Sequence, residues 1–249
     1  MNICIDIGNS RTKIAVFDAA DVLQHRSIIN GIITPAEAEA YLQQFPVQYG
    51  IVSSVAQPTP ALAAWVAQQP NFIFFTPATP LPLTHRYATP ETLGRDRMAL
   101  AVASYYLFPQ RNVLAIDGGT CLTYNFTDAA ACFWGGAIAP GVNMRYKALH
   151  HFTARLPLVA IDTPPPADFI GNSTQHAIQS GVLYGTTAEI EQTVHRYRRR
   201  FGECQVLLTG GSAPLLASLL KIPLFLQPNA VLFGLHKILQ YHYTPIDKP

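Results

Sequence analysis

The chain reads Ile3-Cys4-Ile5-Asp6-Ile7-Gly8-Asn9-Ser10-Arg11-Thr12-Lys13 near its start, and residues 113–123 repeat the pattern with Asp117-Gly118-Gly119-Thr120 at its centre. Each stretch is an apolar run, then Asp-x-Gly with Asn or Gly and a hydroxyl residue, then a second β-prone run. This pattern predicts a hairpin whose tight turn presents backbone N–H groups and a hydroxyl to an anion. Two such hairpins facing each other would clamp the phosphates of a nucleotide, so we expect a phosphoryl-transfer enzyme.

The first turn contains groups with distinct expected roles. Ser10 can donate a hydroxyl hydrogen bond, and Lys13 can reach phosphates as a point charge. Asp6 repels phosphate directly, so we expect it to act through Mg²⁺ or its water shell. Taken alone, the turn could have a purely steric origin, because hairpin turns often use Asp, Gly and Asn.

The second turn places Asp117, Thr120 and Thr123 directly after an apolar run. This arrangement suits a cation and a phosphate. Because the two turns occupy matching places in two halves of the chain, a steric origin is less favoured for the pair than for either turn alone.

Two further glycine motifs are candidates. Asp96, within Gly94-Arg95-Asp96-Arg97, lies at a predicted helix N-terminus and could be a general base, or a first-turn carboxylate held by an arginine. Arg97, or failing that Arg95, could hold a substrate or phosphate. Gly210 and Gly211 follow a predicted strand and would let an adenine or ribose lie against the backbone, although an ordinary strand-to-helix turn also accounts for them.

Composition limits the function classes. The chain has 249 residues, 49% hydrophobic and 13% charged, with a net charge of +2. We therefore expect no broad nucleic-acid surface, and we interpret the short basic run 196–200 as the solvated face of a helix. No signal peptide or membrane span is expected. The four cysteines show no metal spacing and suit a reducing cytoplasm.

The predicted elements repeat after about 110 residues. A hairpin over 2–17 opens the first series of strands and helices, and a hairpin over 112–127 opens the second. A long helix near 173–200 and a final helix over 229–241 belong to the second series. The sequence thus predicts two α/β domains, 1–110 and 111–249, with a cleft between them. The tail from Pro245 is expected to be loose.

The order of motifs resembles that of type III pantothenate kinases, over residues 2 to about 236. The resemblance rests on Asp6-Ile-Gly-Asn-Ser, Tyr87 to Arg97, Asp117-Gly-Gly-Thr, Gly135 to Gly141, and 172–181. This family belongs to the actin-like superfamily of sugar kinases, acetate kinases and chaperone ATPases. The resemblance implies two duplicated RNase H-like (actin-like ATPase) domains with a nucleotide cleft between them.

The resemblance also implies an activity, namely ATP-dependent phosphorylation of pantothenate to 4′-phosphopantothenate, the first committed step of coenzyme A synthesis. Asp96 corresponds to the catalytic base, and Asp117 to a ligand of a monovalent cation, K⁺ or NH₄⁺. The positions that correspond to pantothenate contacts are Tyr87, Gly94, Arg95, Asp96, Arg97 and Thr174. The positions that correspond to ATP contacts are Asp6, Ile7, Gly8, Asn9, Ser10, Arg11, Thr12, Lys13 and Thr120. The family is homodimeric, with the substrate site completed near the subunit interface.

Two departures from the family pattern bear on these expectations. Cys121 replaces the usual alanine, which is also small. Asn125 replaces a frequent aspartate, so dependence on the monovalent cation could be weaker here. The alternatives are another hydroxyl kinase of the superfamily, a non-catalytic regulatory homologue, and a phosphatase, for which no water-activating carboxylate can be placed.

Overall fold

The computed structural model describes residues 1–55 and 58–243, so the tail from Pro245 lies outside the described residues. The chain forms two compact units. The first unit comprises Met1–Pro109, Ala131–Phe133 and Asn229–Pro249, and the second comprises Gln110–Ala130 and Trp134–Pro228.

The first unit is built on a five-stranded sheet of order β3-β2-β1-β4-β5. Its strands are β1 (Asn2–Ile7), β2 (Arg11–Phe17), β3 (Leu23–Asn30), β4 (Tyr49–Ser54) and β5 (Phe72–Phe74). The first three strands are antiparallel, and β4 and β5 continue in parallel with β1. This arrangement confirms the predicted hairpin and its third strand.

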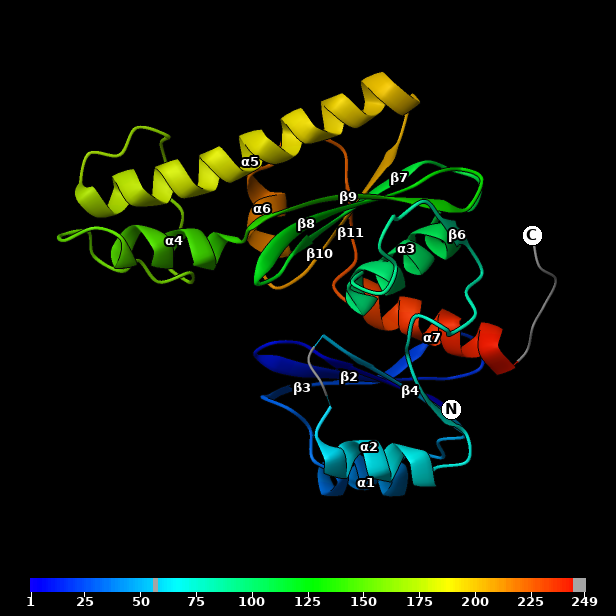
Figure 1. Cartoon of the computed structure of the whole chain (residues 1–249). Helices are drawn as coiled ribbons and strands as arrows, with labels where there is room; N and C mark the ends of the chain where they lie inside the picture. The colour runs from blue at the N-terminus through cyan, green and yellow to red at the C-terminus, as the bar shows by residue number, and fades with distance from the viewer. Residues whose placement is uncertain (56–57, 244–249) are drawn as a thin grey trace. The chain divides into compact units, whose positions relative to one another are not determined.

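Helices cover both faces of this sheet (Figure 1). On one face lie α1 (Pro35–Gln44) and α2 (Pro60–Gln68), which pack on a core that includes Ile5 and Ile14. A capping box between Thr34 and Glu37 starts α1, as the Thr-Pro sequence predicts. On the other face lies α7 (Ala230–Tyr243), which packs against α3 (Arg95–Leu107).

The second unit repeats the strand order of the first. Its sheet has the order β11-β10-β7-β8-β9. Its strands are β7 (Val113–Gly118), β8 (Cys121–Thr127), β9 (Cys132–Pro140), β10 (Gln205–Thr209) and β11 (Phe225–Leu226). The two-residue β6 (Thr84–His85) pairs with Cys132 and Phe133, which group with the first unit. The shared strand order confirms the predicted duplication, whereas β6 and β11 are too short for the sequence pattern to have indicated them.

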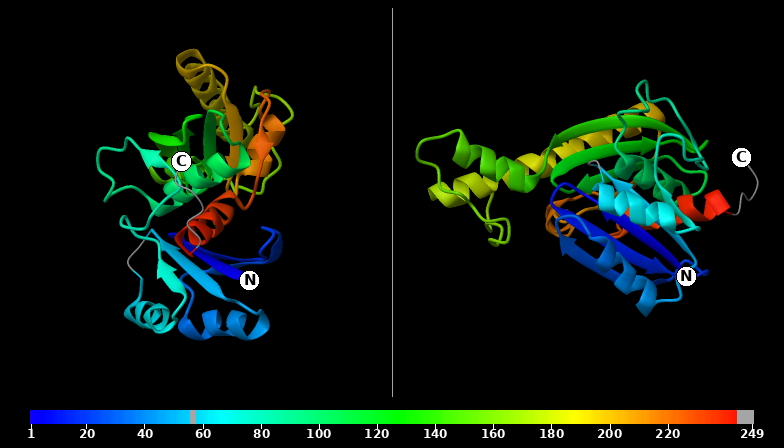
Figure 2. Two further views of the ribbon diagram at one scale, coloured as in Figure 1. Left: turned by 90° about the vertical axis from the view of Figure 1, so that its right-hand side faces the viewer. Right: turned by 60° about the horizontal axis from the view of Figure 1, so that its bottom comes forward.

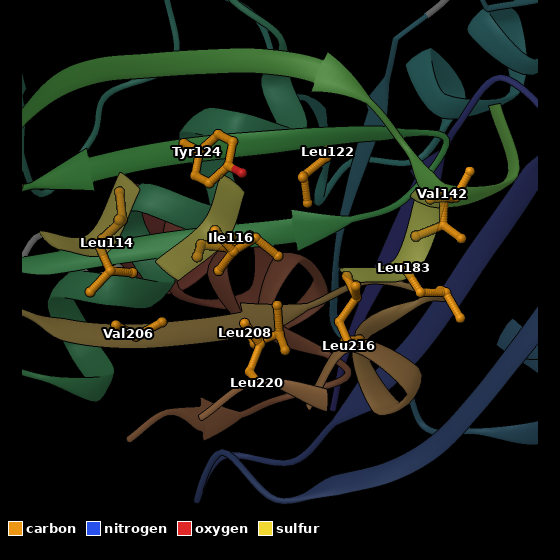
Figure 3. Packing of buried hydrophobic residues seen from close by; sticks show 14 of the residues in the cluster. Leu114, Ile116, Leu122, Tyr124, Val142, Leu183, Val206, Leu208, Leu216 and Leu220 are labelled. Atoms are coloured by element: carbon orange, nitrogen blue, oxygen red, sulfur yellow. The ribbon is translucent and has the colours of Figure 1, made fainter. Parts of the chain in front are cut away.

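The core of the second unit lies between its sheet and three helices, α4 (Val142–His151), α5 (Thr174–Phe201) and α6 (Ala213–Leu219). Figure 3 shows side chains from β7, β8 and β10 converging with Leu183 of α5 and Leu216 of α6. Ser173 caps α5 by accepting a hydrogen bond from the backbone N–H of His176.

Helix α7 groups with the first unit by contact, although it follows the second unit in sequence. The predicted domain boundary at 110/111 divides the sequence into its two duplicated halves and so assigns this helix to the second half. The grouping by contacts instead assigns α7 to the first unit. The physical reason is that the apolar side of α7 covers the first sheet.

Candidate active site

The first turn has the predicted form. The N–H of Gly8 donates to the carbonyl of Arg11 over 2.9 Å, which closes the hairpin between β1 and β2. Asn9, Ser10 and Arg11 are exposed at its tip. The turn therefore offers its polar groups to solvent while the strands on both sides are buried.

Three polar residues form a row across neighbouring strands beside this turn. Asp6 is in register with Lys13 of β2 and with Ser53 of β4, so the three side chains share the sheet face opposite the Ile5 core. Asp6 is 5% exposed. The buried Oγ of Ser53 hydrogen-bonds to no residue that the structure describes. Such a row is suited to holding a charged ligand with its counter-ion.

Besides Asp6, two residues of the predicted ATP-contact stretch, Ile7 and Thr12, are buried. The hydroxyl of Thr12 donates to the carbonyl of Gly31 over 2.6 Å and accepts from the N–H of Ile33. Ile7 is part of the hydrophobic core. Their side chains stabilise the hairpin, so a contact of either residue with a ligand would have to use its backbone.

Asp96 lies in the first turn of α3 and is partly exposed. Its Oδ1 accepts a hydrogen bond of 2.8 Å from the backbone N–H of Arg97. The N-terminus of a helix stabilises negative charge there. The carboxylate is consequently fixed by one oxygen, in a position typical of a first-turn acid.

Tyr87 and Arg97 lie together, as expected for two residues of one binding site. Nη1 of Arg97 is 3.4 Å from the hydroxyl of Tyr87, and its guanidinium carbon is 5.6 Å from the centre of the ring. Tyr87 in turn stacks on Phe133. Arg97 is 6% exposed, so its guanidinium is largely shielded from solvent.

Arg95 has a different environment. Its Nη2 donates to the carbonyl of Pro90 over 2.8 Å, and its guanidinium lies over Phe75. Burial lowers the pKa of Arg95, while Asp96 opposes that change. The hydrogen bond from Arg95 to Pro90 fixes the loop that precedes α3.

The second turn also stands beside a polar row. Asp117 is in register with Thr123 of β8 and with Thr209 of β10, which places the three side chains on one sheet face. Nδ2 of the buried Asn125 donates to Oγ1 of Thr123 over 2.9 Å. The residue that departs from the family pattern therefore orients a hydroxyl of this row.

The conformation of Gly210 requires glycine after β10. Its φ is +96°, and a Cβ at this position would overlap Oδ1 of Asp117. The N–H of Ser212 donates to the carbonyl of Gly118 over 2.9 Å, which ties the start of α6 to the second turn. Gly211 has no atom within 4 Å of its Cβ position. The structure thus brings the predicted Gly210 to Asp117, while Thr120 is exposed at the tip of the turn.

Thr174 belongs to the second unit, at the start of α5, and lines a cavity of about 720 Å³ between α4 and α5. Arg145 also lines this cavity and forms an ion pair of 2.6 Å with Glu189. Glu189 accepts a second hydrogen bond, of 2.8 Å, from the buried Tyr124 hydroxyl. Burial, with Glu189, raises the pKa of Tyr124, so it stays a donor.

The sequence reasoning missed two features of these sites. Ser53 directly follows the apolar residues Ile51 and Val52 in β4, and this polar residue after an apolar run was the signal available for it. Arg145 and Glu189 are 44 residues apart in the chain, and no local pattern pairs them.

Two kinds of feature, a protein-only metal cluster and a membrane-spanning helix, are absent from the part of the chain that the structure describes. Within 1–55 and 58–243, no three His, Cys, Asp or Glu side chains form a cluster that could hold a metal ion by themselves. In the same ranges, no helix is long and apolar enough to cross a bilayer.

Comparison with known proteins identifies the relatives of this chain. A family model described as type III pantothenate kinase matches residues 2–196. A type III pantothenate kinase from Flavobacterium johnsoniae is 40% identical over 242 residues, covering 97% of this chain and 98% of that protein. One from Cytophaga hutchinsonii is 41% identical over 244 residues, covering 97% and 100% respectively.

Solved structures agree on the fold. A chain from Campylobacter jejuni, described as belonging to the Baf family of transcriptional activators, has a TM-score of 0.62 at 21% identity, covering 96% of this chain and 97% of that one. A glucokinase from an Antarctic psychrotroph has a TM-score of 0.53 at 14% identity, covering 96% and 98%. These likenesses concern the fold alone, which is that of actin-like ATPases and sugar kinases.

Proposed function

This chain belongs to the type III pantothenate kinase family, and on that basis we propose which of its residues carry the reaction. The protein is a kinase that phosphorylates pantothenate with ATP in coenzyme A biosynthesis. The observation that carries the assignment of residues is Asp96, a partly exposed carboxylate fixed by one oxygen at the first turn of α3.

Asp96 is the general base. Its Oδ1 accepts the N–H of Arg97, which orients the carboxylate and leaves Oδ2 to take the proton of the pantothenate hydroxyl. As that proton is removed, the hydroxyl oxygen attacks the γ-phosphorus of ATP, the bond from this phosphorus to the bridging oxygen of the β-phosphate breaks, and ADP leaves. Most of the remaining catalysis is positioning and electrostatic stabilisation.

Arg97 and Tyr87 hold the anionic end of pantothenate. A buried guanidinium beside a phenol hydroxyl offers two kinds of donor to a carboxylate, and the charge-assisted bond is the stronger one. Gly94 and Arg95 shape this binding loop, Arg95 through its hydrogen bond to Pro90. Thr174, whose position corresponds to a pantothenate contact in the family, is a further proposed binding residue.

ATP is bound by the two turns. Asn9, Ser10, Arg11 and Thr120 are exposed and present backbone and side-chain donors to phosphate, while Lys13 adds positive charge. Ile7, Gly8 and Thr12 contribute through their backbone. Gly210 and Gly211 give the nucleoside a surface without side chains, next to Asp117.

The donor sets fit the two cations of the proposal. Asp6 provides one hard carboxylate, which suits Mg²⁺ that keeps water and phosphate as its other ligands. Asp117 stands in register with the hydroxyls of Thr123 and Thr209, an all-oxygen set that suits K⁺ or NH₄⁺. Both cations, when bound, offset the negative charge of the phosphates.

A homodimer accounts for an exposed apolar surface on the second unit. Helix α4 and the first half of α5 run alongside each other beyond the sheet (Figure 2). Beside them, Phe152 is 80% exposed, and Phe169 and Ile170 are each 67% exposed. Exposed apolar groups gathered in this way mark association surfaces. We place the dimer in the cytoplasm, where the four cysteines, which form no disulfide, stay reduced.

The test is a coupled ADP-release assay with purified protein, Mg²⁺, ATP and KCl, with and without pantothenate. We expect ADP release that depends on pantothenate, and a lower rate of release when KCl is replaced by choline chloride. ADP release independent of pantothenate would overturn the substrate assignment. Equal rates with K⁺ and choline would overturn the role given to Asp117.

A further inference from the structure

A second cavity of the second unit lies between the end of α5 and the start of β9. It has a volume of about 380 Å³ and is lined by Trp134, Gly135, Gly136, Arg196, Tyr197, Arg200 and Phe201. We call it the α5–β9 pocket. None of the residues proposed above for catalysis, ATP or pantothenate lines it.

The pocket contains two arginines four residues apart on one helix. Arg196 and Arg200 are exposed, and neither forms an ion pair with a carboxylate in the described part of the chain. Residues at this spacing are neighbours on the helix surface. The two guanidinium groups can therefore converge on one anion.

Stabilisation of the helix end does not account for both arginines of the pocket. Arg198 donates to the carbonyl of Cys204 and pairs with Glu203, so it already stabilises the end of α5. The helix dipole favours cations in the last turn, and its effect falls off beyond it. Arg196 precedes the last helical residue, Phe201, by more than one turn.

The wall of the pocket is aromatic and fixed. The ring of Phe201 lies 5.1 Å from Trp134 and 4.4 Å from the buried Phe126. Nε1 of Trp134 donates a hydrogen bond of 2.6 Å to Oδ2 of Asp128. This bond holds the indole in place and engages the carboxylate of Asp128. The guanidinium of Arg200 lies 5.0 Å from the centre of the Phe201 ring. The cavity is therefore preorganised.

The opposite wall is bare backbone. Gly135 and Gly136 have φ values of 97° and 157°, and a Cβ on Gly136 would overlap the carbonyl of Tyr124. Glycine at both positions leaves this wall of the cavity without side chains, so a ligand can approach the main chain closely.

From these observations we infer that the α5–β9 pocket is a second binding site, separate from the proposed active site, for a phosphate monoester. The anionic group of the ligand must match two arginine forks. A phosphate group, with three terminal oxygens and about two negative charges, does so better than a carboxylate group, which has two oxygens and one charge. The aromatic wall accommodates the organic part of the ligand. This inference is independent of the residue roles proposed for catalysis.

The experiment uses the two tryptophans of the chain, Trp65 and Trp134. Full-length protein labelled with 5-fluorotryptophan is titrated with inorganic phosphate and with phenyl phosphate, at constant ionic strength set by NaCl. ¹⁹F NMR follows both resonances, which Trp65→Phe assigns. We expect a saturable shift of the Trp134 resonance, with phenyl phosphate binding more tightly than phosphate.

Matched variants decide the outcome. The Arg196→Gln/Arg200→Gln double variant should raise the apparent Kd at least about tenfold, because two charge-assisted contacts are lost. Arg199→Gln removes the same kind of charge from the same helix outside the pocket and should leave the Kd unchanged. A shift that does not saturate, or equal effects of Arg199→Gln and the double variant, would overturn the proposal. Thermal melting of each variant checks its folding.

Discussion

Nε2 of His236, on α7, lies 2.9 Å from Oδ1 of Asp21, in the turn between β2 and β3, across 215 residues of sequence. His236 is fully buried and stacks on Phe17. Its Nδ1 lies 3.4 Å from Nδ2 of Asn2. Both contacts suit a neutral imidazole that donates to Asp21 and accepts from Asn2. Lys237 and Gln240 also bond to Asp21, so this cluster fastens α7 to the first sheet.

The cluster predicts acid sensitivity. Burial lowers the pKa of His236, although Asp21 opposes the change. Burial would raise the pKa of Asp21, but Lys237, His236 and Gln240 together lower it. The unfolded chain therefore binds more protons at both groups in acid. Stability should fall as pH drops below about 6.5, and again below about 4.

Urea denaturation between pH 8 and pH 5 measures this effect. His236→Gln should flatten the decline between about pH 7 and pH 5.5, because glutamine does not titrate. His242→Gln removes a histidine from the same helix outside the cluster and should leave the pH profile unchanged. A wild-type profile in His236→Gln would remove His236 from this role.

Asp96→Asn should reduce kcat at least about 100-fold, since a general base is lost, while binding of ATP is retained. Steady-state kinetics with calorimetric titration of a non-hydrolysable ATP analogue separates the two effects. Glu91→Gln, in the exposed loop before α3, is the matched control and should keep near-normal activity. Near-normal turnover in Asp96→Asn would contradict the base assignment.

Asp117→Asn should weaken the use of ATP and of the monovalent cation more than it weakens pantothenate binding. The carboxylate supplies the formal charge of the row that it forms with Thr123 and Thr209. We expect KM for ATP to rise about tenfold or more and activation by KCl to decrease. Asp162→Asn, exposed in the same unit, is the control. A change confined to the KM for pantothenate would show that the second turn was assigned wrongly.

Gly210→Ala and Gly211→Ala form a matched pair. A Cβ at Gly210 meets Asp117 and requires a left-handed backbone, whereas a Cβ at Gly211 meets nothing. We expect Gly210→Ala to lower the free energy of unfolding by about 1–3 kcal/mol and to raise KM for ATP. Gly211→Ala should stay within about 0.5 kcal/mol of wild type. Equal effects in urea denaturation would contradict this account of the turn.

Phe169→Asp should dissociate the proposed dimer, because it places a charge on the exposed apolar surface of the second unit. Sedimentation equilibrium and light scattering measure the mass. Ile138→Asp, 62% exposed on β9, tests whether any apolar-to-acid change has the same effect. A wild-type protein that is monomeric at all concentrations would remove this interpretation of the surface.

Much of the fold and part of the site could be predicted from the sequence. Apolar runs with Asp-x-Gly turns predicted both hairpins, and the Thr-Pro start of α1 predicted its cap. Asp96 could be placed in the first turn of a helix because Gly94 precedes an Ala-rich stretch. These features are local, since backbone preferences and burial periodicity act over a few neighbouring residues.

Other features depended on which distant segments pack together. The contact of Gly210 with Asp117 follows from the pairing of β10 with β7, and the Arg145–Glu189 pair from the packing of α4 on α5. Arg196, Arg199 and Arg200 are exposed, as the solvent-facing interpretation of 196–200 predicts. Arg196 and Arg200 also line a cavity, which no local pattern indicates, because β9 lies beside them. Local sequence patterns were thus sufficient for the elements, their duplicated order and the family. The meeting of particular side chains depended on tertiary structure, because strand pairing and helix packing join residues whose separation no local pattern encodes.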